Sequence, residues 1–249
     1  MSSVLYLVLL FGAAVSAKHV LPSYVKTCLR NDPKLNECAL KNGKEIIPKI
    51  IKGDPSIRLP VLDPMVLDKV GIRTTGRTNG GGLQLTCYKC NVHGLGNAVL
   101  KDIKIDLAKK HIDLKIFLPQ LTVSGKYDVN GKLLLFPITG KGQANLTLID
   151  LDVEAGLDWK LIKRKGSEYA HISRDRVDFT TSRFKLSLTG LFGGDKALSD
   201  NMNQILNDNW REVLDDLKPS ISGTVGEIIK FTLNNIFDMI PYELFFPEK

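Results

Sequence analysis

Apolar and polar residues alternate through the middle of the chain, a pattern typical of half-buried β-strands. From about residue 83 to residue 192, most segments follow this period of two. The runs 103–107 and 112–118 lie on either side of Lys109-Lys110 and predict a β-hairpin. Asn130-Gly131, the dipeptide favoured in two-residue turns, predicts a second hairpin, and residues 163–166 predict a third.

One predicted strand is unusually long. Residues 151–161 alternate without interruption and predict a strand of at least eleven residues, about twice the usual length. Leu146 and Leu148 lie in the opposite phase, so we expect a bulge or bend near Ile149-Asp150. Together these segments predict an antiparallel meander of long strands with one apolar face.

Helical spacing flanks the meander on both sides. Residues 33–52 place apolar side chains on one side of a helix, with Pro48 predicting a break or kink. After Gly193-Gly194 the apolar residues recur at threes and fours to about Met239, which predicts one helix of about 45 residues bent only at Pro219. Such a helix must bury its apolar stripe, and the meander has an apolar face to cover. The predicted fold class is therefore α+β, with a long C-terminal helix on a curved antiparallel sheet.

The start of the chain has the pattern of a secretory signal. The apolar run 4–15 is too short to span a bilayer and leads into Val15-Ser16-Ala17, so we expect cleavage after Ala17. Residues 18–249 are then expected to form a single domain of a secreted, extracellular protein. The formal net charge of +7 is spread along the chain, which does not favour nucleic-acid binding.

Four cysteines in a secreted chain suggest disulfides. Cys28 and Cys38 enclose a predicted turn and are the expected pair. Cys87 and Cys90 lie in a predicted strand, where a bond between them would require a local turn, so two half-buried thiols or a locally distorted bridge remain open. A zinc site built from this pair and His93 lacks a fourth ligand, and we expect no metal and no cofactor.

Signatures of catalysis are scarce in this sequence. It contains no nucleophile elbow, no zinc-protease motif and no phosphate-binding loop, and the carboxylates from Asp150 to Asp158 fall on the polar side of a strand. We therefore expect a protein that is not an enzyme. Asn145-Leu146-Thr147 is an N-glycosylation sequon, which predicts a glycan on Asn145.

Several segments in order resemble the takeout and juvenile-hormone-binding family of secreted insect proteins. These are the pair Cys28 and Cys38, residues 133–142 leading into the sequon, the long C-terminal helix and the closing residues 240–247. The resemblance is closer to the takeout branch, because a second long-range disulfide has no matching cysteine pair. It implies a curved sheet wrapped around the helix, enclosing an apolar tunnel. It also implies a carrier of juvenile hormone, fatty-acyl or terpenoid-like molecules, with roles in circadian, feeding or chemosensory signalling.

The inward phases of the predicted elements supply candidate residues for lining that tunnel. They are Ile116, Leu118, Phe136, Leu157, Trp159, Phe184, Leu186, Trp210, Ile228 and Phe237. Core packing is the competing explanation for each of them, since an interior must be filled in any fold. The expected partner is an apolar small molecule or lipid bound by a monomer, with transient membrane or receptor contact. The alternative function is recognition of a membrane or lipid surface through the positive charge.

Overall fold

The computed structural model describes residues 21–74, 82–164 and 166–249, so the expected signal segment lies outside the described residues. The strands are β1 (Met65–Arg73), β2 (Leu83–His93), β3 (Val99–Asp106), β4 (His111–Leu133), β5 (Phe136–Arg164), β6 (Ser167–Thr180) and β7 (Arg183–Leu188). The helices are α1 (Leu35–Ile50), α2 (Lys196–Asp208), α3 (Trp210–Phe237) and α4 (Tyr242–Phe245), and short 3-10 turns occur at Pro55–Ile57, Leu95–Asn97 and Phe192–Gly194.

A single long hairpin, β4 and β5, forms the centre of the antiparallel sheet. At one end β4 pairs with β2 and β5 pairs with β7, whereas at the other end β4 pairs with β3 and β5 pairs with β6. The two halves meet at Asp150, whose φ of 49° distorts β5 locally and interrupts its pairing with β4. The predicted bend at this point is confirmed, and β5 runs through it for 29 residues.

The turn of the central hairpin differs from the prediction. β4 continues through Asn130-Gly131, and the turn falls at Leu134-Leu135, between the paired residues Leu133 and Phe136. Gly131 has a φ of 133°, and a Cβ at this position would lie 2.2 Å from the carbonyl oxygen of Gly82. The glycine is therefore required by the close approach of the β2 end. The hairpins predicted at Lys109-Lys110 and at residues 163–166 are confirmed.

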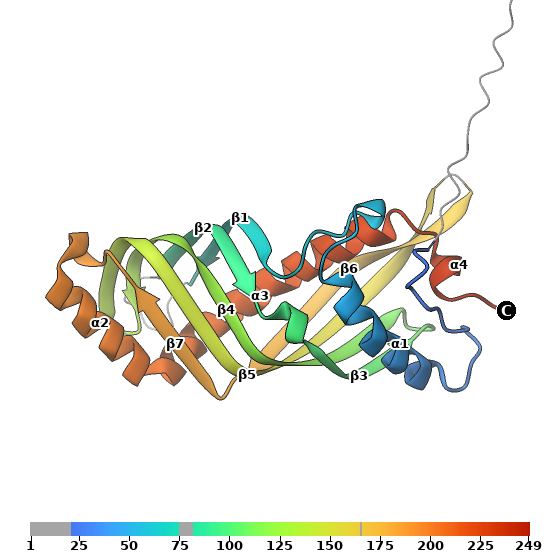
Figure 1. Cartoon of the computed structure of the whole chain (residues 1–249), viewed down its shortest axis with the longest axis horizontal. Helices are drawn as coiled ribbons and strands as arrows, with labels where there is room; N and C mark the ends of the chain where they lie inside the picture. Colours follow the sequence, from blue (N-terminus) through green and yellow to red (C-terminus); the bar gives the residue numbers. More distant parts are fainter. Residues whose placement is uncertain (1–20, 75–81, 165) are drawn as a thin grey trace, which may run out of the picture.

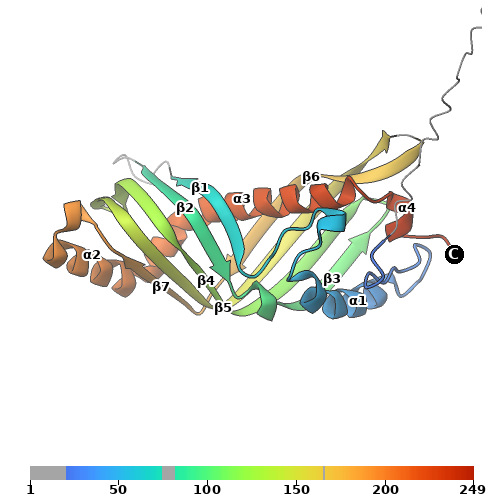
Figure 2. The same ribbon diagram turned by 45° about the horizontal axis from the view of Figure 1, so that its top comes forward.

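The predicted C-terminal helix is two helices. Asn209, with φ −106° and ψ 35°, separates α2 from α3, whereas Pro219 lies inside α3 without ending it. The apolar spacing continues across the break because Leu206 and Trp210 are buried in the same cluster, which hides the break from a periodicity argument. Figures 1 and 2 show α3 lying lengthwise along the curved sheet and α2 at one end of the molecule.

Strand β7 has a free edge that α2 covers with asparagine side chains. The Oδ1 of Asn207 accepts the N–H of Leu186 at 3.0 Å, and its Nδ2 donates to the Leu186 carbonyl at 2.7 Å. Asn203, one helical turn earlier, makes the same pair of bonds with Leu188, both at 2.8 Å. Asn203 and Asn207 lie on the same face of α2, four residues apart. They therefore reach Leu188 and Leu186, which lie two residues apart on the same edge of β7. These amides satisfy backbone groups that no further strand reaches.

Helix α3 is fixed to the edges of two other strands. The amide of Asn234 accepts the N–H of Ile172 in β6 at 2.7 Å and donates to its carbonyl at 3.1 Å. In the first half of α3, the hydroxyl of Ser220 donates to the carbonyl of Arg73 in β1 at 2.7 Å. Gly226 lets α3 approach β6 closely, since a Cβ there would lie 2.0 Å from an Asp175 oxygen. Helix α3 therefore spans the opening that the sheet leaves.

Helix α1 covers the remaining edge, that of β3. The Oδ1 of Asn36 accepts the N–H of Ile105 at 2.8 Å, and Gly43 faces the side chain of Leu100. None of the α1 side chains is fully buried. A small apolar cluster lies between α1 and the end of α3. Its buried members are Ile57, Leu59 and Ile240.

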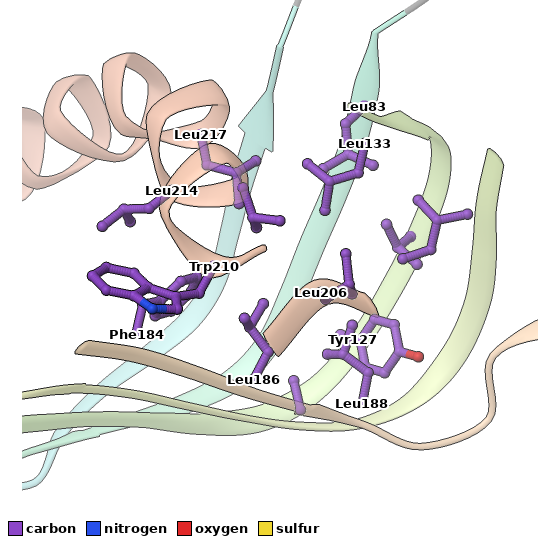
Figure 3. Close-up of a cluster of buried hydrophobic side chains, with 14 of the residues drawn as sticks. Leu83, Tyr127, Leu133, Phe184, Leu186, Leu188, Leu206, Trp210, Leu214 and Leu217 are labelled. Carbon is purple, nitrogen blue, oxygen red and sulfur yellow. The ribbon is translucent and has the colours of Figure 1, made fainter. Parts of the chain in front are cut away.

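Two apolar clusters lie between the sheet and the helices. The core cluster lies toward α2, and its members drawn in Figure 3 include Leu83, Tyr127, Leu133, Phe184, Leu186, Leu188, Leu206, Trp210, Leu214 and Leu217. The distal cluster lies on β5, β6 and the second half of α3, and its buried members are Leu157, Trp159, Ala170 and Ile172. The interior therefore has a core end and a distal end.

We predict that Asn207→Ala lowers the free energy of unfolding by about 1–3 kcal/mol, because two backbone groups of Leu186 lose their partners. Urea denaturation followed by circular dichroism measures the change. Asn201→Ala, an exposed asparagine on the same helix, is the matched control and should stay within about 0.5 kcal/mol of the wild type. Equal effects of the two substitutions would contradict the edge-capping role.

Candidate ligand-binding site

The structure gathers most of the predicted lining residues in the two clusters. Leu118, Phe184, Leu186 and Trp210 are buried in the core cluster, and Ile116 packs against it. Leu157 and Trp159 are buried in the distal cluster, and Phe237 packs against it. Ile228 on α3 is half-buried and belongs to neither cluster. The placement of the clustered residues in a shared interior agrees with the predicted phases, and contact of any of these residues with a ligand stays a prediction.

Phe136 is not part of this interior. It directly follows the turn of the β4–β5 hairpin, and 40% of its side chain is exposed. Its paired residue Leu133 is buried. The displaced turn accounts for the difference, because Phe136 begins β5 at the hairpin end instead of following a turn at Asn130-Gly131 within the body of the sheet.

The two ends of the interior differ in how completely they are filled. In the core cluster, 19 fully buried residues outnumber 11 half-buried apolar neighbours. In the distal cluster, only four residues are fully buried, against nine half-buried apolar neighbours. A packed interior buries its apolar side chains fully. The distal end therefore buries its apolar side chains less completely than the core end does.

Strand register shows that some of these half-buried side chains face inward. Ile105 pairs with Ile112, and Ile112 pairs with Leu157, so the three share one face of the sheet. Leu157 is 2% exposed, whereas Ile105 and Ile112 are half-buried. The half-buried neighbours of the distal cluster are Ile105, Leu107, Ile112, Leu114, Leu161, Ile229, Leu233, Phe237 and Tyr242. Most of them were missed because the apolar phase identifies the inner face but not the positions that stay uncovered.

Aromatic side chains close the distal end. The ring of Tyr242 in α4 lies 6.5 Å from that of Trp159, measured between centroids. Phe237 and Phe245 meet edge to face at 5.2 Å, and Tyr242 and Phe246 lie 5.6 Å apart. The C-terminal residues thus form an aromatic cap over the distal cluster. No single motif marks this cap in the sequence, since its members come from a strand, two helices and the tail.

The aromatic cap is fastened by a loop near the start of the described chain. Arg30 donates from its Nε to the carbonyl of Phe246 at 2.8 Å, and from its backbone N–H to the carbonyl of Pro247 at 3.0 Å. Its guanidinium group also lies 5.8 Å from the centre of the Tyr242 ring. A disulfide between Cys28 and Cys38, with Cα atoms 6.0 Å apart, is present as predicted and holds this loop to α1.

The interior offers few polar groups. The Nε1 of Trp159 is buried and has no hydrogen-bond partner within the structure, and 5% of the side chain is exposed. In the core cluster, the hydroxyl of Tyr127 donates to the carbonyl of Thr189 at 2.8 Å, and burial raises its pKa to about 12. Burial also raises the pKa of Tyr242. Both phenols are therefore neutral at physiological pH, which suits a neutral apolar molecule.

The other cysteine pair is also bonded. Cys87 and Cys90 form a disulfide in β2, where the pairing register shifts between Tyr88 and Asn91 and Lys89 has a φ of 49°. The locally distorted bridge is confirmed, and the bonded sulfurs are not thiolate ligands for zinc. Asn145 is exposed on β5, and its glycosylation stays a prediction.

Charged side chains surround His111 at the start of β4, and together with it they are called the His111 group. Its Nδ1 lies 2.6 Å from a carboxylate oxygen of Asp158, and its Nε2 lies 3.1 Å from one of Asp113. Hydrogen bonds to Asp158 and then to Asp113 raise the pKa of His111 above its ordinary value of 6.5. The guanidinium of Arg174 lies 3.8 Å from Asp158. This arrangement links adjacent strands and places no nucleophile beside the imidazole.

We predict that the His111 group stabilises the fold at low pH. Because the pKa is raised on folding, the stabilisation is complete below about pH 6.5 and is lost as the pH rises through the folded-state pKa. Chemical denaturation at a series of pH values from 5.5 to 8.5 should show the wild type losing stability relative to His111→Gln. Parallel pH profiles for the two proteins would contradict this role.

The fold defines a class of elongated α+β protein in which a curved sheet and a long helix share an apolar interior. The family model described as haemolymph juvenile hormone binding protein matches residues 5–247. The chain therefore belongs to this family, and the resemblance noted in the sequence is confirmed.

Individual relatives support the same assignment. The chain is similar to the circadian clock-controlled protein daywake of Drosophila melanogaster, with 27% identity over 94% of this chain and 92% of the relative. Daywake of Drosophila yakuba is also 27% identical, over 93% of this chain and 90% of the relative. Takeout 1 of Epiphyas postvittana has a crystal structure that matches with a TM-score of 0.73 and 29% identity, covering 87% of this chain and 97% of that chain.

The predicted fold class is confirmed, with the sheet open and its gap spanned by helices. Among the helices of the described residues, none is both long and apolar enough to cross a membrane.

Proposed function

We propose that this protein is a secreted, monomeric carrier that binds an apolar small molecule between the sheet and α3, without catalysing a reaction. The observation that carries the proposal is the incomplete burial at the distal end. Inward-facing Ile105 and Ile112 are half-buried beside the fully buried Leu157. An apolar molecule lying there would cover side chains that the protein itself leaves uncovered.

The chemistry of the interior favours a long, largely hydrocarbon ligand. Burial of each CH₂ group contributes about 0.8 kcal/mol, so a long chain reaches useful affinity with few polar contacts. The N–H of Trp159 is a hydrogen-bond donor without an acceptor among the described residues. A carbonyl, ester or carboxyl oxygen on an otherwise apolar ligand would complement it once the aromatic cap moves. Fatty-acyl and terpenoid-like molecules, including juvenile hormone, have this composition.

The relatives indicate a physiological setting. The family is described as binding juvenile hormone in the haemolymph, and daywake is described as controlled by the circadian clock. We extend these properties to this chain as proposals, with release into the haemolymph and a role in circadian, feeding or chemosensory signalling. The expected secretory signal at residues 4–17 is consistent with that setting.

Filling the distal end should block the ligand. Leu233 on α3 is half-buried against the distal cluster, and we predict that Leu233→Trp raises the dissociation constant for a fluorescent long-chain fatty acid at least tenfold. The added ring would take the place of several ligand CH₂ groups, and tenfold corresponds to about 1.4 kcal/mol.

Phe231→Trp is the matched control for this variant. Phe231 lies two residues earlier on α3, and 69% of its side chain is exposed. Its substitution should leave the dissociation constant unchanged, and circular dichroism should show both variants folded. Equal affinities of the Leu233 and Phe231 variants would place the ligand outside the distal end.

The fastened cap predicts slow ligand exchange. Removing the Cys28–Cys38 disulfide by a double serine substitution frees the loop that carries Arg30, so we expect ligand dissociation to become severalfold faster. Stopped-flow displacement of the fluorescent fatty acid measures this rate. Replacing Cys87 and Cys90 by serine removes a bond that lies in β2, away from the cap, and should not change the rate. An unchanged rate in the Cys28–Cys38 variant would refute the role of the cap.

A further inference from the structure

The turn between β4 and β5 consists of two apolar residues, of which Leu134 is half-buried and Leu135 is exposed. Leu134 and Leu135 form the turn, and Phe136 and Pro137 follow it in β5. Leu135 is 77% exposed, the highest value among the large apolar side chains of the described residues. We call residues 134–137 the β4–β5 tip. It lies at the end of the molecule that also holds α2 (Figure 1).

Packing against the core cluster explains the apolar character of Leu134 but not that of Leu135, most of whose surface is exposed. Leu134 has a φ of 56°, a left-handed conformation that asparagine or glycine adopts with less steric cost. Asn130-Gly131, a dipeptide well suited to such a turn, lies only a few residues earlier inside β4. Leu135 places a large apolar side chain in solvent at a turn, where polar residues are usual, and such exposure marks a contact surface.

The charge beside the tip is positive. Lys132 is exposed at the end of β4, and residues 129–140 contain no aspartate or glutamate. The preceding acidic residue, Asp128, is neutralised by Lys141 at 2.8 Å. Among the ion pairs found within the described residues, none involves Lys132. The tip thus combines apolar side chains with one unneutralised ammonium group.

The shape of the tip favours a lipid bilayer over a protein partner. Stable protein interfaces bury about 800 Å² on each partner, which a hairpin turn with three or four apolar side chains does not provide. A bilayer admits such side chains singly, while a neighbouring lysine keeps its ammonium group among anionic headgroups. Leu133 is buried in the core cluster and Leu134 packs against it, so the tip is rooted in the rigid end of the interior.

We propose that the β4–β5 tip inserts into the interfacial region of anionic membranes and orients the protein on them. That this docking serves loading or delivery of an apolar ligand rests on the proposed carrier function. The docking itself does not require a bound ligand, which allows the two proposals to be tested separately.

Co-sedimentation with vesicles tests the docking. The full chain should bind vesicles of phosphatidylcholine and phosphatidylserine at 3:1 more tightly than vesicles of phosphatidylcholine alone, and added salt should weaken the binding. Leu135→Asp should lower the affinity for the anionic vesicles at least fivefold. Lys132→Glu should lower it and reduce the dependence on salt.

Phe231→Asp is the matched control, because Phe231 is 69% exposed but lies on α3. Its substitution should leave vesicle binding unchanged. A loss equal to that of Leu135→Asp would show that the tip is not the docking site. Equal binding by wild type and Leu135→Asp would overturn the proposal outright.

Fluorescence gives a second test that does not depend on loss of binding. The native Trp159 and Trp210 are each 5% exposed, so their emission should not change when vesicles are added. A change in emission on adding vesicles then comes from a tryptophan introduced at the tip. Leu135→Trp should shift its emission to the blue on anionic vesicles and be quenched by brominated lipids. Emission unchanged by vesicles to which the variant sediments would place the contact elsewhere and contradict the proposal.

Binding of a fluorescent fatty acid in the absence of vesicles separates the two proposals. Leu135→Asp should leave this affinity unchanged, since the tip lies outside the interior. Vesicle binding that depends on the tip, with no fatty-acid binding, would support docking and contradict the carrier function. Fatty-acid binding without tip-dependent vesicle binding would support the carrier function and contradict docking.

Discussion

The structure depends on one constraint: a curved antiparallel sheet with an apolar face must be covered, and its free edges must be satisfied, by helices. The side-chain amides of Asn203, Asn207 and Asn234 each accept a hydrogen bond from a backbone N–H and donate one to a backbone carbonyl. Their partners lie on the free edges of β7 and β6. These bonds fix α2 and α3 beside the sheet edges as well as over its face. Because the helices are held by polar groups at the edges, the space between the layers need not be filled completely by apolar side chains.

This arrangement divides the interior into a core end and a distal end that differ in how completely their apolar side chains are buried. The core cluster, with most of its members fully buried, supplies the stability that a folded chain requires. The distal cluster has more half-buried apolar neighbours than buried members and ends at the aromatic cap. Under the proposed carrier function, stability and ligand binding fall at opposite ends of one continuous sheet. The exposed apolar turn lies at the core end, where the rigid packing of Leu133 supports it.

Much of the fold could be predicted because alternation and helical spacing are local consequences of burying one face. The bend at Ile149-Asp150 was predictable because the apolar phase reverses there. The turn at Asn130-Gly131 was mispredicted. Gly131 is needed there because the backbone of Gly82, a residue far away in the sequence, lies too close to leave room for a Cβ atom. The break at Asn209 was invisible because both helices bury residues in the same cluster.

The candidate site was less predictable than the fold. Periodicity places Leu157 and Ile112 on the same inner face, but it does not tell which one the remaining structure covers. That outcome depends on where α3 lies, which the edge bonds of Asn234 and Ser220 determine. The cap likewise joins Trp159 to the C-terminal tail through contacts between distant segments.

A crystal structure with a bromine-labelled long-chain fatty acid tests the central claim most directly, because the anomalous signal of bromine locates the ligand. We expect the bromine between α3 and the inner face of the sheet, against the half-buried neighbours of Leu157 and Trp159. A label found only on the outer surface, or an interior closed by its own side chains with no ligand inside, would contradict it.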